Sequence, residues 1–350
     1  MNVNKLLWVD LIRVTAIILV VLQHVATPLI FSFDSISIDD WWVANIFHTF
    51  SDVCVPLLFM ISGYLLLNKN DSLFVFFSKR INKVLLPLII WSIIYLFWNK
   101  YYSQTIEINL TKVIQTFITP AHYHLWFLYT ILSLYLLIPV LRIYVKHAST
   151  NMQHYIIAIW FLSVSIHPFV IKLLGVKPAV EDLNIFSGYL GYILLGYMLG
   201  NASIRKSYFL PLILTSLILT TFTIIATYYA TIHNHGVLIK YFHTYLSPNI
   251  IILSAVCFII LKSMPDVFSI LHSSKVMVFI RSSSSASLGI YLLHVIIFIV
   301  IREGDANVSI TPFSYKAIYS IPLLTLLVFL ITFGIILIAK NIPVIKRCVP

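Results

Sequence analysis

The sequence predicts an all-α fold, a polytopic bundle of about ten transmembrane helices in which residues 1–350 form a single integral-membrane domain. Of the 350 residues, 60% are hydrophobic and only 10% are charged, and the mean hydropathy is +0.97. A soluble domain usually carries about 25% charged residues, so this chain lacks the polar surface that water requires. We therefore expect the chain to be embedded in lipid.

Apolar segments of transmembrane length recur along the whole sequence. A bilayer core about 30 Å thick needs roughly 20 mainly apolar residues per helix. Such windows lie approximately at residues 6–33, 43–67, 84–103, 122–142, 152–170, 184–200, 208–232, 246–263, 284–302 and 314–340. The connections between them are short, so the function has to lie within the bundle.

The basic residues predict the orientation of the bundle. The net charge is +11, and in a protein with many spans Lys and Arg act as topology signals. With ten spans and both termini cytoplasmic, six of the 23 basic residues lie outside and Arg13 and Lys316 lie within or beside spans, which leaves 15 inside. The first span lacks a small-residue cleavage site, so we expect it to be retained.

Three ionisable residues lie in the first span, in the segment DLIRVTAIILVVLQH. Arg13 and His24 are eleven residues apart, which is about three helical turns and about 16 Å, so both project from one face. Asp10 and Arg13 could simply form an i, i+3 pair, and His24 could be a packing residue. A buried histidine that shares a face with an arginine is also a candidate general base.

Five sequence elements occur in an order that is similar to one known family. They are Arg13 with His24, Ser62 and Gly63 in VPLLFMISGYLLL, Arg80 and Lys83 in SKRINKVLLPLIIWS, His124 and Trp126 in HYHLWFLY, and Tyr291 and His294 in SLGIYLLH. Together they resemble the membrane acyltransferase-3 proteins, which O-acylate cell-surface glycans. The versions of the motifs resemble most the subgroup that contains the enterobacterial common antigen O-acetyltransferase.

The resemblance implies an acyl-CoA-dependent O-acetyltransferase in the bacterial inner membrane, with both termini cytoplasmic. It implies acetyl-CoA as the donor substrate, a glycan or lipid-linked sugar as the acceptor, membrane lipid as the surroundings, and neither a tightly bound cofactor, a metal nor nucleic acid. The implied roles are catalysis for His24 and Arg13, donor binding for Arg80, Lys83, Ser62 and Gly63, and acceptor binding or support for Asp10, His124, Trp126, Tyr291 and His294.

Each of these residues also has a structural interpretation. Small residues such as Ser62 and Gly63 allow helices to approach closely. Arg80 and Lys83 satisfy the positive-inside rule whatever the function. Trp126 is placed where an interfacial anchor is common, and His294 fits a packing role. Direct transfer and a covalent acyl-histidine relay both fit the sequence.

Five further residues are of types that serve metal or proton chemistry. His48 and Asp52 are spaced i, i+4 and share a face of the second span, which makes them a weak candidate pair. His233, His235 and His243 fall in one predicted outer loop, where no Cys or carboxylate pattern completes a metal site, so we expect them to be solvated.

A transporter or flippase for a polysaccharide or lipid-linked glycan is the alternative function, because buried Arg and His also suit substrate and proton pathways. The sequence shows no clear inverted repeat, nor matched short Gly/Pro-interrupted spans in its two halves, as such transporters often do. A membrane scaffold without chemistry would leave the intramembrane Arg and His unexplained.

Overall fold

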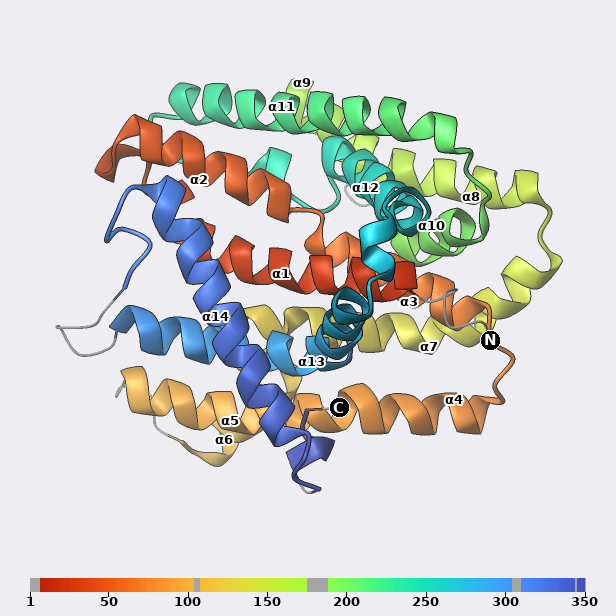
Figure 1. Ribbon diagram of the computed structural model, residues 1–350, viewed down its shortest axis with the longest axis horizontal. Coiled ribbons are helices and arrows are strands. Elements are labelled where there is room, and N and C mark those ends of the chain that lie inside the picture. Colours follow the sequence, from red (N-terminus) through yellow and green to blue (C-terminus); the bar gives the residue numbers. More distant parts are fainter. Residues whose placement is uncertain (1–6, 104–107, 175–187, 304–309, 344, 350) are drawn as a thin grey trace.

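The computed structural model describes residues 7–103, 108–174, 188–303, 310–343 and 345–349. Across these ranges the chain forms helices joined by short turns, and none of the described residues is in a strand. Figure 1 shows most of the long helices running side by side along the longest axis of the molecule. The predicted all-α bundle is confirmed.

Nine helical runs within the described ranges are long and apolar enough to cross a membrane. They are built from α1 (Leu7–Ile30), α2 (Ile38–Ser51) with α3 (Cys54–Leu67), α4 (Leu73–Arg80) with α5 (Leu86–Ser103), α7 (Trp126–His147), α8 (Thr150–Phe161) with α9 (His167–Leu174), α11 (Phe209–His233), α12 (Pro248–Val267), α13 (Ser274–Glu303) and α14 (Ala317–Ala339).

The remaining predicted span, residues 184–200, begins in residues outside the described ranges. Its described part is α10 (Leu190–Asn201), which is 12 residues long and mostly buried. The other short helix, α6 (Leu110–Ile118), follows α5. Nine full spans and the end of a tenth segment therefore agree with a bundle of about ten.

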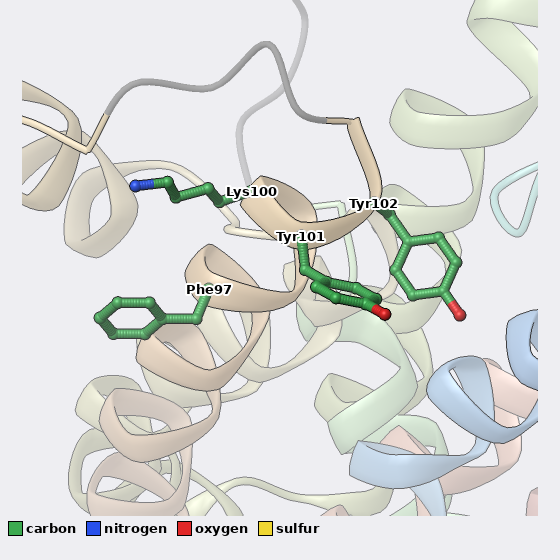
Figure 2. A pocket seen from close by; sticks show the side chains of 4 residues that line it. All are labelled: Phe97, Lys100, Tyr101 and Tyr102. Atoms are coloured by element: carbon green, nitrogen blue, oxygen red, sulfur yellow. The ribbon is translucent and has the colours of Figure 1, made fainter.

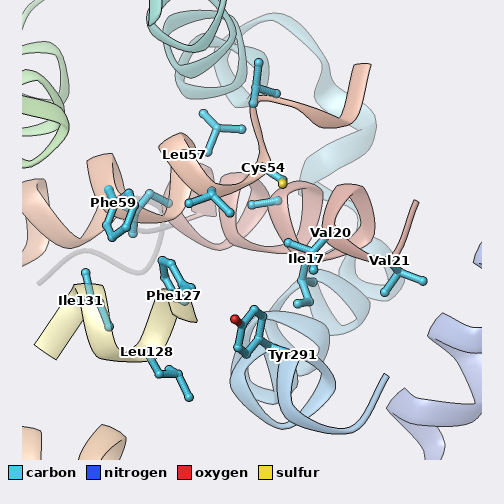
Figure 3. Packing of buried hydrophobic residues seen from close by; sticks show 14 of the residues in the cluster. Ile17, Val20, Val21, Cys54, Leu57, Phe59, Phe127, Leu128, Ile131 and Tyr291 are labelled. Atoms are coloured by element: carbon cyan, nitrogen blue, oxygen red, sulfur yellow. The ribbon is translucent and has the colours of Figure 1, made fainter. Parts of the chain in front are cut away.

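Helix α1 forms the centre of the bundle. It packs against α2, α3, α12, α13 and α14, and its side chains at Ile12, Ala16 and Val25 have no exposed surface. Figure 3 shows apolar side chains of α1 meeting those of α3 and α7, with Tyr291 of α13 beside them. Because α1 is covered on so many sides, its polar residues face protein.

Helices α3 and α10 approach each other through glycine. A Cβ at Gly63 would lie 1.9 Å from the carbonyl oxygen of Ile193, and one at Gly196 would lie 2.0 Å from that of Met60. Any side chain at either position would push the helices apart. Small residues at such contacts are the usual means of bringing membrane helices together.

The second span is broken, which the hydropathy pattern did not predict. Helix α2 ends at Ser51 and α3 starts at Cys54, so Asp52 and Val53 lie in a turn inside the span. Pro56 explains the break, because a proline has no N–H for the carbonyl four residues earlier, here that of Asp52, and its ring clashes with it. Interrupted helices at membrane depth occur where the backbone is covered by protein.

The third helical run starts earlier than the predicted residue 84. Helix α4 begins at Leu73, and a π-helical segment, Ile81–Leu85, connects it to α5 without a loop. This wider turn ends at Leu85, two residues before Pro87, which cannot continue the normal α-helical hydrogen-bond pattern. Arg80 and Lys83, which we expected in a basic segment ahead of the span, therefore lie inside the helical run.

Candidate active site

One end of α1 holds a polar network that joins α1 to α13. Arg13 lies 3.5 Å from Asp10, as the i, i+3 spacing predicts. Ser284 completes the network, because its hydroxyl donates to Asp10 at 2.6 Å and accepts from the Arg13 guanidinium at 2.9 Å. Arg13 thus has a fixed position with only part of its hydrogen-bonding capacity used.

A second arginine lies beside a tyrosine of α7. The Arg80 guanidinium lies 5.5 Å from the ring centre of Tyr135 and 5.2 Å from that of Phe76. Tyr135 is also close enough to Arg13 to interact with it electrostatically, and to Ser62 to hydrogen-bond. We call Arg13, Arg80 and Tyr135 the arginine cluster.

The arginine cluster has unused hydrogen-bonding capacity. The Nε of Arg80 is buried and has no hydrogen-bond partner among the described residues. A buried, unpaired charged donor is costly. An anionic group that reached this position would find a donor already in place.

Further basic residues surround Arg80 toward the end of the bundle. Lys69 and Lys83 are exposed, and Lys69 lies within electrostatic range of both Arg80 and Lys83. Partial burial and then the charge of Arg80 lower the pKa of Lys69 from its usual value. Arg142 has a structural task instead, because it donates to the backbone carbonyls of Leu66 at 2.9 Å and Asp71 at 3.2 Å.

The two small residues of the second span separate in role. Ser62 donates to the carbonyl of Leu58 at 2.9 Å within its own helix and lies beside the arginine cluster. The backbone of Ile193 occupies the space beside Gly63, so a ligand has no room to contact this glycine. The close-packing interpretation accounts for Gly63, and donor contact by Ser62 stays a prediction.

Farther along α1, three histidines from three helical segments meet. The His24 ring centre lies 5.1 Å from that of His294 on α13 and 6.5 Å from that of His124, which lies in the short 3-10 helix Tyr123–Leu125 ahead of α7. His124 and His294 are 5.4 Å apart by the same measure. We call these three residues the histidine cluster.

The hydrogen bonds of His294 define its tautomer. Its Nδ1 contacts only carbonyl oxygens, that of Tyr291 at 2.7 Å and that of Ile290 at 3.2 Å, so Nδ1 has to carry the proton. In a neutral imidazole the other nitrogen is then a free acceptor. That Nε2 is buried and has no partner among the described residues.

The other two rings of the histidine cluster also have unused nitrogens. His124 contacts His122 through Nδ1 at 3.2 Å, and its buried Nε2 is unpartnered in the described part of the chain. Burial lowers the pKa of His122 to about 4, so this neighbour is neutral at pH 7. His24 makes no hydrogen bond with the described residues and keeps some exposed surface. Free imidazole nitrogens at one place can exchange a proton with a bound substrate.

Tyrosines hold the histidine cluster in place. The Tyr291 hydroxyl donates to the backbone carbonyl of His124, which ties α13 to the start of α7. The Tyr95 hydroxyl donates to the carbonyl of Leu292 at 2.8 Å, which ties α5 to α13. Tyr291 therefore supports His124 through the backbone.

Trp126 is partly buried and packs against other aromatic residues. Its ring stacks on Tyr245 with centres 5.9 Å apart and 21° between planes, and it also contacts Tyr189 at 5.5 Å. An interfacial anchor would point its ring at headgroups. Trp126 therefore lies among aromatic rings two residues after His124, and the interfacial-anchor interpretation stays a prediction.

A second group of ionisable residues lies at the break between α2 and α3. Asp52 accepts from His243 Nδ1 at 2.6 Å and from Gln23 Nε2 at 3.2 Å, and the Nδ1 of His48 lies 3.2 Å from its carboxylate. We call His48, Asp52 and His243 the carboxylate cluster. His243, which ends the 3-10 helix Lys240–His243 before α12, is buried, so its interpretation as a solvated loop residue is wrong. His233 and His235 are exposed as expected.

A surface depression of about 640 Å³ lies at the end of α5, and none of its lining residues belongs to the arginine, histidine or carboxylate cluster. Figure 2 shows its lining side chains, Phe97, Lys100, Tyr101 and Tyr102. Exposed aromatic residues beside a lysine at a helix end are typical of the membrane-water interface. This depression therefore fits lipid headgroup contact better than chemistry.

The structure brings the predicted site residues together in two places on α1. Asp10, Arg13, Arg80 and Ser62 gather at one end, and His24, His124, Tyr291 and His294 gather farther along. Ser284 and Tyr135 were missed. The run Ser282–Ser285 was a visible signal for Ser284, whereas Tyr135 is one of many aromatic residues in its span and gave none.

Comparison with known proteins identifies the family of the chain. A family model described as an acyltransferase domain, Acyl_transf_3, matches residues 6–340. No curated protein and no solved structure matches the chain. The family match covers nearly the whole sequence, including both places on α1 where polar residues gather. The chain belongs to the acyltransferase-3 family.

Proposed function

We propose that this membrane acyltransferase moves an acetyl group from cytoplasmic acetyl-CoA to a hydroxyl of a cell-surface glycan or lipid-linked sugar. The observation that carries the proposal is that one helix, α1, holds Arg13 in the arginine cluster and His24 in the histidine cluster, eleven residues apart. Donor and acceptor can thus approach from opposite ends of the same buried stripe.

The arginine cluster suits the phosphates of CoA. Arg80 has a buried donor to spare, and exposed Lys69 and Lys83 add point charges around it. Guanidinium groups bind phosphate through paired hydrogen bonds, and lysines contribute attraction at longer range. The pantetheine arm of the donor would then extend along α1 over a distance of about 16 Å, toward His24.

The histidine cluster suits the transfer step. His24 takes the proton from the acceptor hydroxyl as the oxygen attacks the thioester carbonyl, so that a C–O bond forms and the C–S bond breaks. The proton then passes to the CoA thiolate, and an ester and free CoA leave. The free Nε2 of His294 offers a second proton acceptor beside His24. This chemistry requires acetyl-CoA as a substrate and no tightly bound cofactor.

The acceptor side is lined by aromatic rings. Tyr123 is 55% exposed and lies 5.2 Å from His24, ring centre to ring centre. A sugar ring could stack on it while a hydroxyl reaches His24. We place the acceptor end at the outer face of the bacterial inner membrane and both termini in the cytoplasm, because the basic residues partition that way. The motif versions support the enterobacterial common antigen subgroup.

Purified full-length protein in detergent or nanodiscs provides the test, with acetyl-CoA labelled on the acetyl group. The proposal predicts release of free CoA and labelled ester that depend on a lipid-linked glycan acceptor. Mass spectrometry of surface glycans from cells with and without the gene identifies the acceptor by its lost acetyl mass. A transporter or flippase would move glycan without consuming acetyl-CoA, and that result would refute the proposal.

A further inference from the structure

The carboxylate cluster has no role in the proposed acyl transfer, and it contains a buried carboxylate whose negative charge has to be balanced. Asp52 has no exposed surface and sits at the break inside the second span. Among the described residues it forms no ion pair with Lys or Arg, and its ionisable neighbours are His48 and His243. An isolated carboxylate at this depth is very unfavourable, so a positive charge has to lie beside it.

The contacts of His243 allow a cation to lie between its ring and the carboxylate. Its Nε2 lies 3.2 Å from the Thr227 hydroxyl, and its Nδ1 lies 2.6 Å from an Asp52 oxygen. Neutral imidazole has one donor and one acceptor nitrogen. With the Thr227 hydroxyl donating to Nε2, Nδ1–H donates to Asp52, which is the metal-free arrangement. With Nε2 donating to Thr227, a lone pair on Nδ1 faces the carboxylate, and a cation between them makes the contact favourable.

His48 adds an unpartnered nitrogen aimed at the same carboxylate. The residue is 9% exposed, and its Nδ1 lies 3.2 Å from Asp52 without the alignment of a hydrogen bond. In a tetrahedral zinc site with bonds near 2.1 Å, neighbouring ligand atoms are about 3.4 Å apart. The 3.2 Å separation is close to that value, and the His243 contact would have to open by about 0.8 Å.

We propose that His48, Asp52 and His243 form a binding site for a divalent transition metal of the zinc type. One ligand atom from each residue lies within 4.8 Å of the others, and the set of two imidazoles and one carboxylate suits Zn²⁺ or Co²⁺. Gln23 donates to Asp52, and Thr227 is placed to accept from His243, which is how outer groups orient metal ligands.

The fold around the cluster also favours a cation. Helix α2 ends at Ser51, so its carbonyl end and partial negative charge point toward the break. Breaks in membrane helices are where ions are bound in other membrane proteins. A metal here would join α2, the segment before α12 and, through Gln23, helix α1. This proposal does not depend on the acyl-transfer proposal.

The test measures metal directly. Full-length protein is purified from cells grown with added zinc, and its metal content is determined by mass spectrometry. Metal is then stripped with a chelator and the protein is titrated with Zn²⁺ and with Co²⁺, whose visible absorption reports coordination by nitrogen and oxygen. We expect about one metal per chain, and at least 100-fold weaker binding for Asp52→Asn and for His48→Gln. Gln23→Ala should weaken binding about 10- to 100-fold.

His233→Ala is the matched control, because His233 is exposed at the end of α11 and outside the cluster. It should bind metal as the unmodified chain does. His48→Gln keeps the Asp52 to His243 hydrogen bond, so it remains informative if Asp52→Asn does not fold. The proposal is overturned if the unmodified chain binds no more zinc than the Asp52→Asn and His48→Gln variants do. In that case the positive charge beside Asp52 is a proton.

Discussion

The histidine cluster and the carboxylate cluster use the same side chain in opposite surroundings. In the histidine cluster no carboxylate contacts His24, His124 or His294, and two Nε2 atoms are left without partners in the described part of the chain. In the carboxylate cluster Asp52 contacts two imidazoles directly. Neutral rings with free nitrogens can take and return a proton. Imidazoles fixed around a carboxylate instead stabilise a positive charge placed between them and the carboxylate.

Two adjacent residues of helix α1 contact the two clusters. His24 belongs to the first, and Gln23 hydrogen-bonds to Asp52 in the second. The comparison teaches that residue type alone does not define the chemistry of a buried histidine. What decides it is whether an acid lies within contact distance.

The largest expected effect comes from His24→Ala. Removing a general base typically costs about 10²- to 10⁴-fold in rate, so acetyl transfer by the purified variant should be nearly abolished. The protein should still insert and remain monodisperse, because an uncharged histidine contributes little to the packing of α1. A folded variant that transfers acetyl at the unmodified rate would leave His24 with a packing role only.

His294→Asn should have the next largest effect. An asparagine amide can replace the Nδ1 hydrogen bond to the Tyr291 carbonyl but removes the free Nε2. We expect the rate constant for transfer to fall about 10- to 100-fold with little change in thermal stability. If the Asn variant were as active as the unmodified enzyme, Nε2 would have no part in proton transfer.

Arg80→Ala should act on donor binding. Phosphate contacts are made in both the ground state and the transition state, so KM for acetyl-CoA should rise about tenfold while kcat stays nearly constant. Lys83→Ala is the matched comparison and should raise KM less, because Lys83 is exposed while Arg80 has a buried donor. A fall in kcat at unchanged KM would count against donor binding at this end.

Gly63→Ala should affect stability and leave the chemistry intact. The added methyl group would meet the Ile193 backbone, and overpacking of this kind costs about 1–3 kcal/mol. Thermal unfolding in detergent should shift downward, with KM and kcat per folded molecule unchanged. A specific rise in KM for acetyl-CoA would instead restore a donor-binding role for Gly63.

The sequence predicts the bundle well because the hydrophobic requirement of a bilayer acts on windows of about 20 residues. Hydropathy averaged over such a window does not reveal helix breaks or helix starts that depend on a few residues. The break at Asp52 depends on one proline, Pro56, in an otherwise apolar run, and the early start of α4 depends on Phe-rich residues that a hydropathy window divides between loop and span.

The site was only partly predictable, for a related reason. Arg13 and His24 share one helix, so their spacing fixes their relation before any tertiary structure is known. His243 and Asp52 are 191 residues apart, and no local pattern indicates that the loop before α12 folds back into the bundle. Tyr135 likewise becomes notable only when two arginines from other helices lie beside it.

In the proposed reaction, the acetyl group passes across the membrane, from the end of α1 near the arginine cluster toward the histidine cluster. Sealed vesicles of known orientation test this most directly, with labelled acetyl-CoA added outside, because CoA is too polar to cross. Inside-out vesicles, which expose the arginine cluster to the added donor, should accumulate labelled ester on glycan in the lumen. Right-side-out vesicles should label only after detergent permeabilisation. Equal labelling of intact right-side-out vesicles would contradict the account.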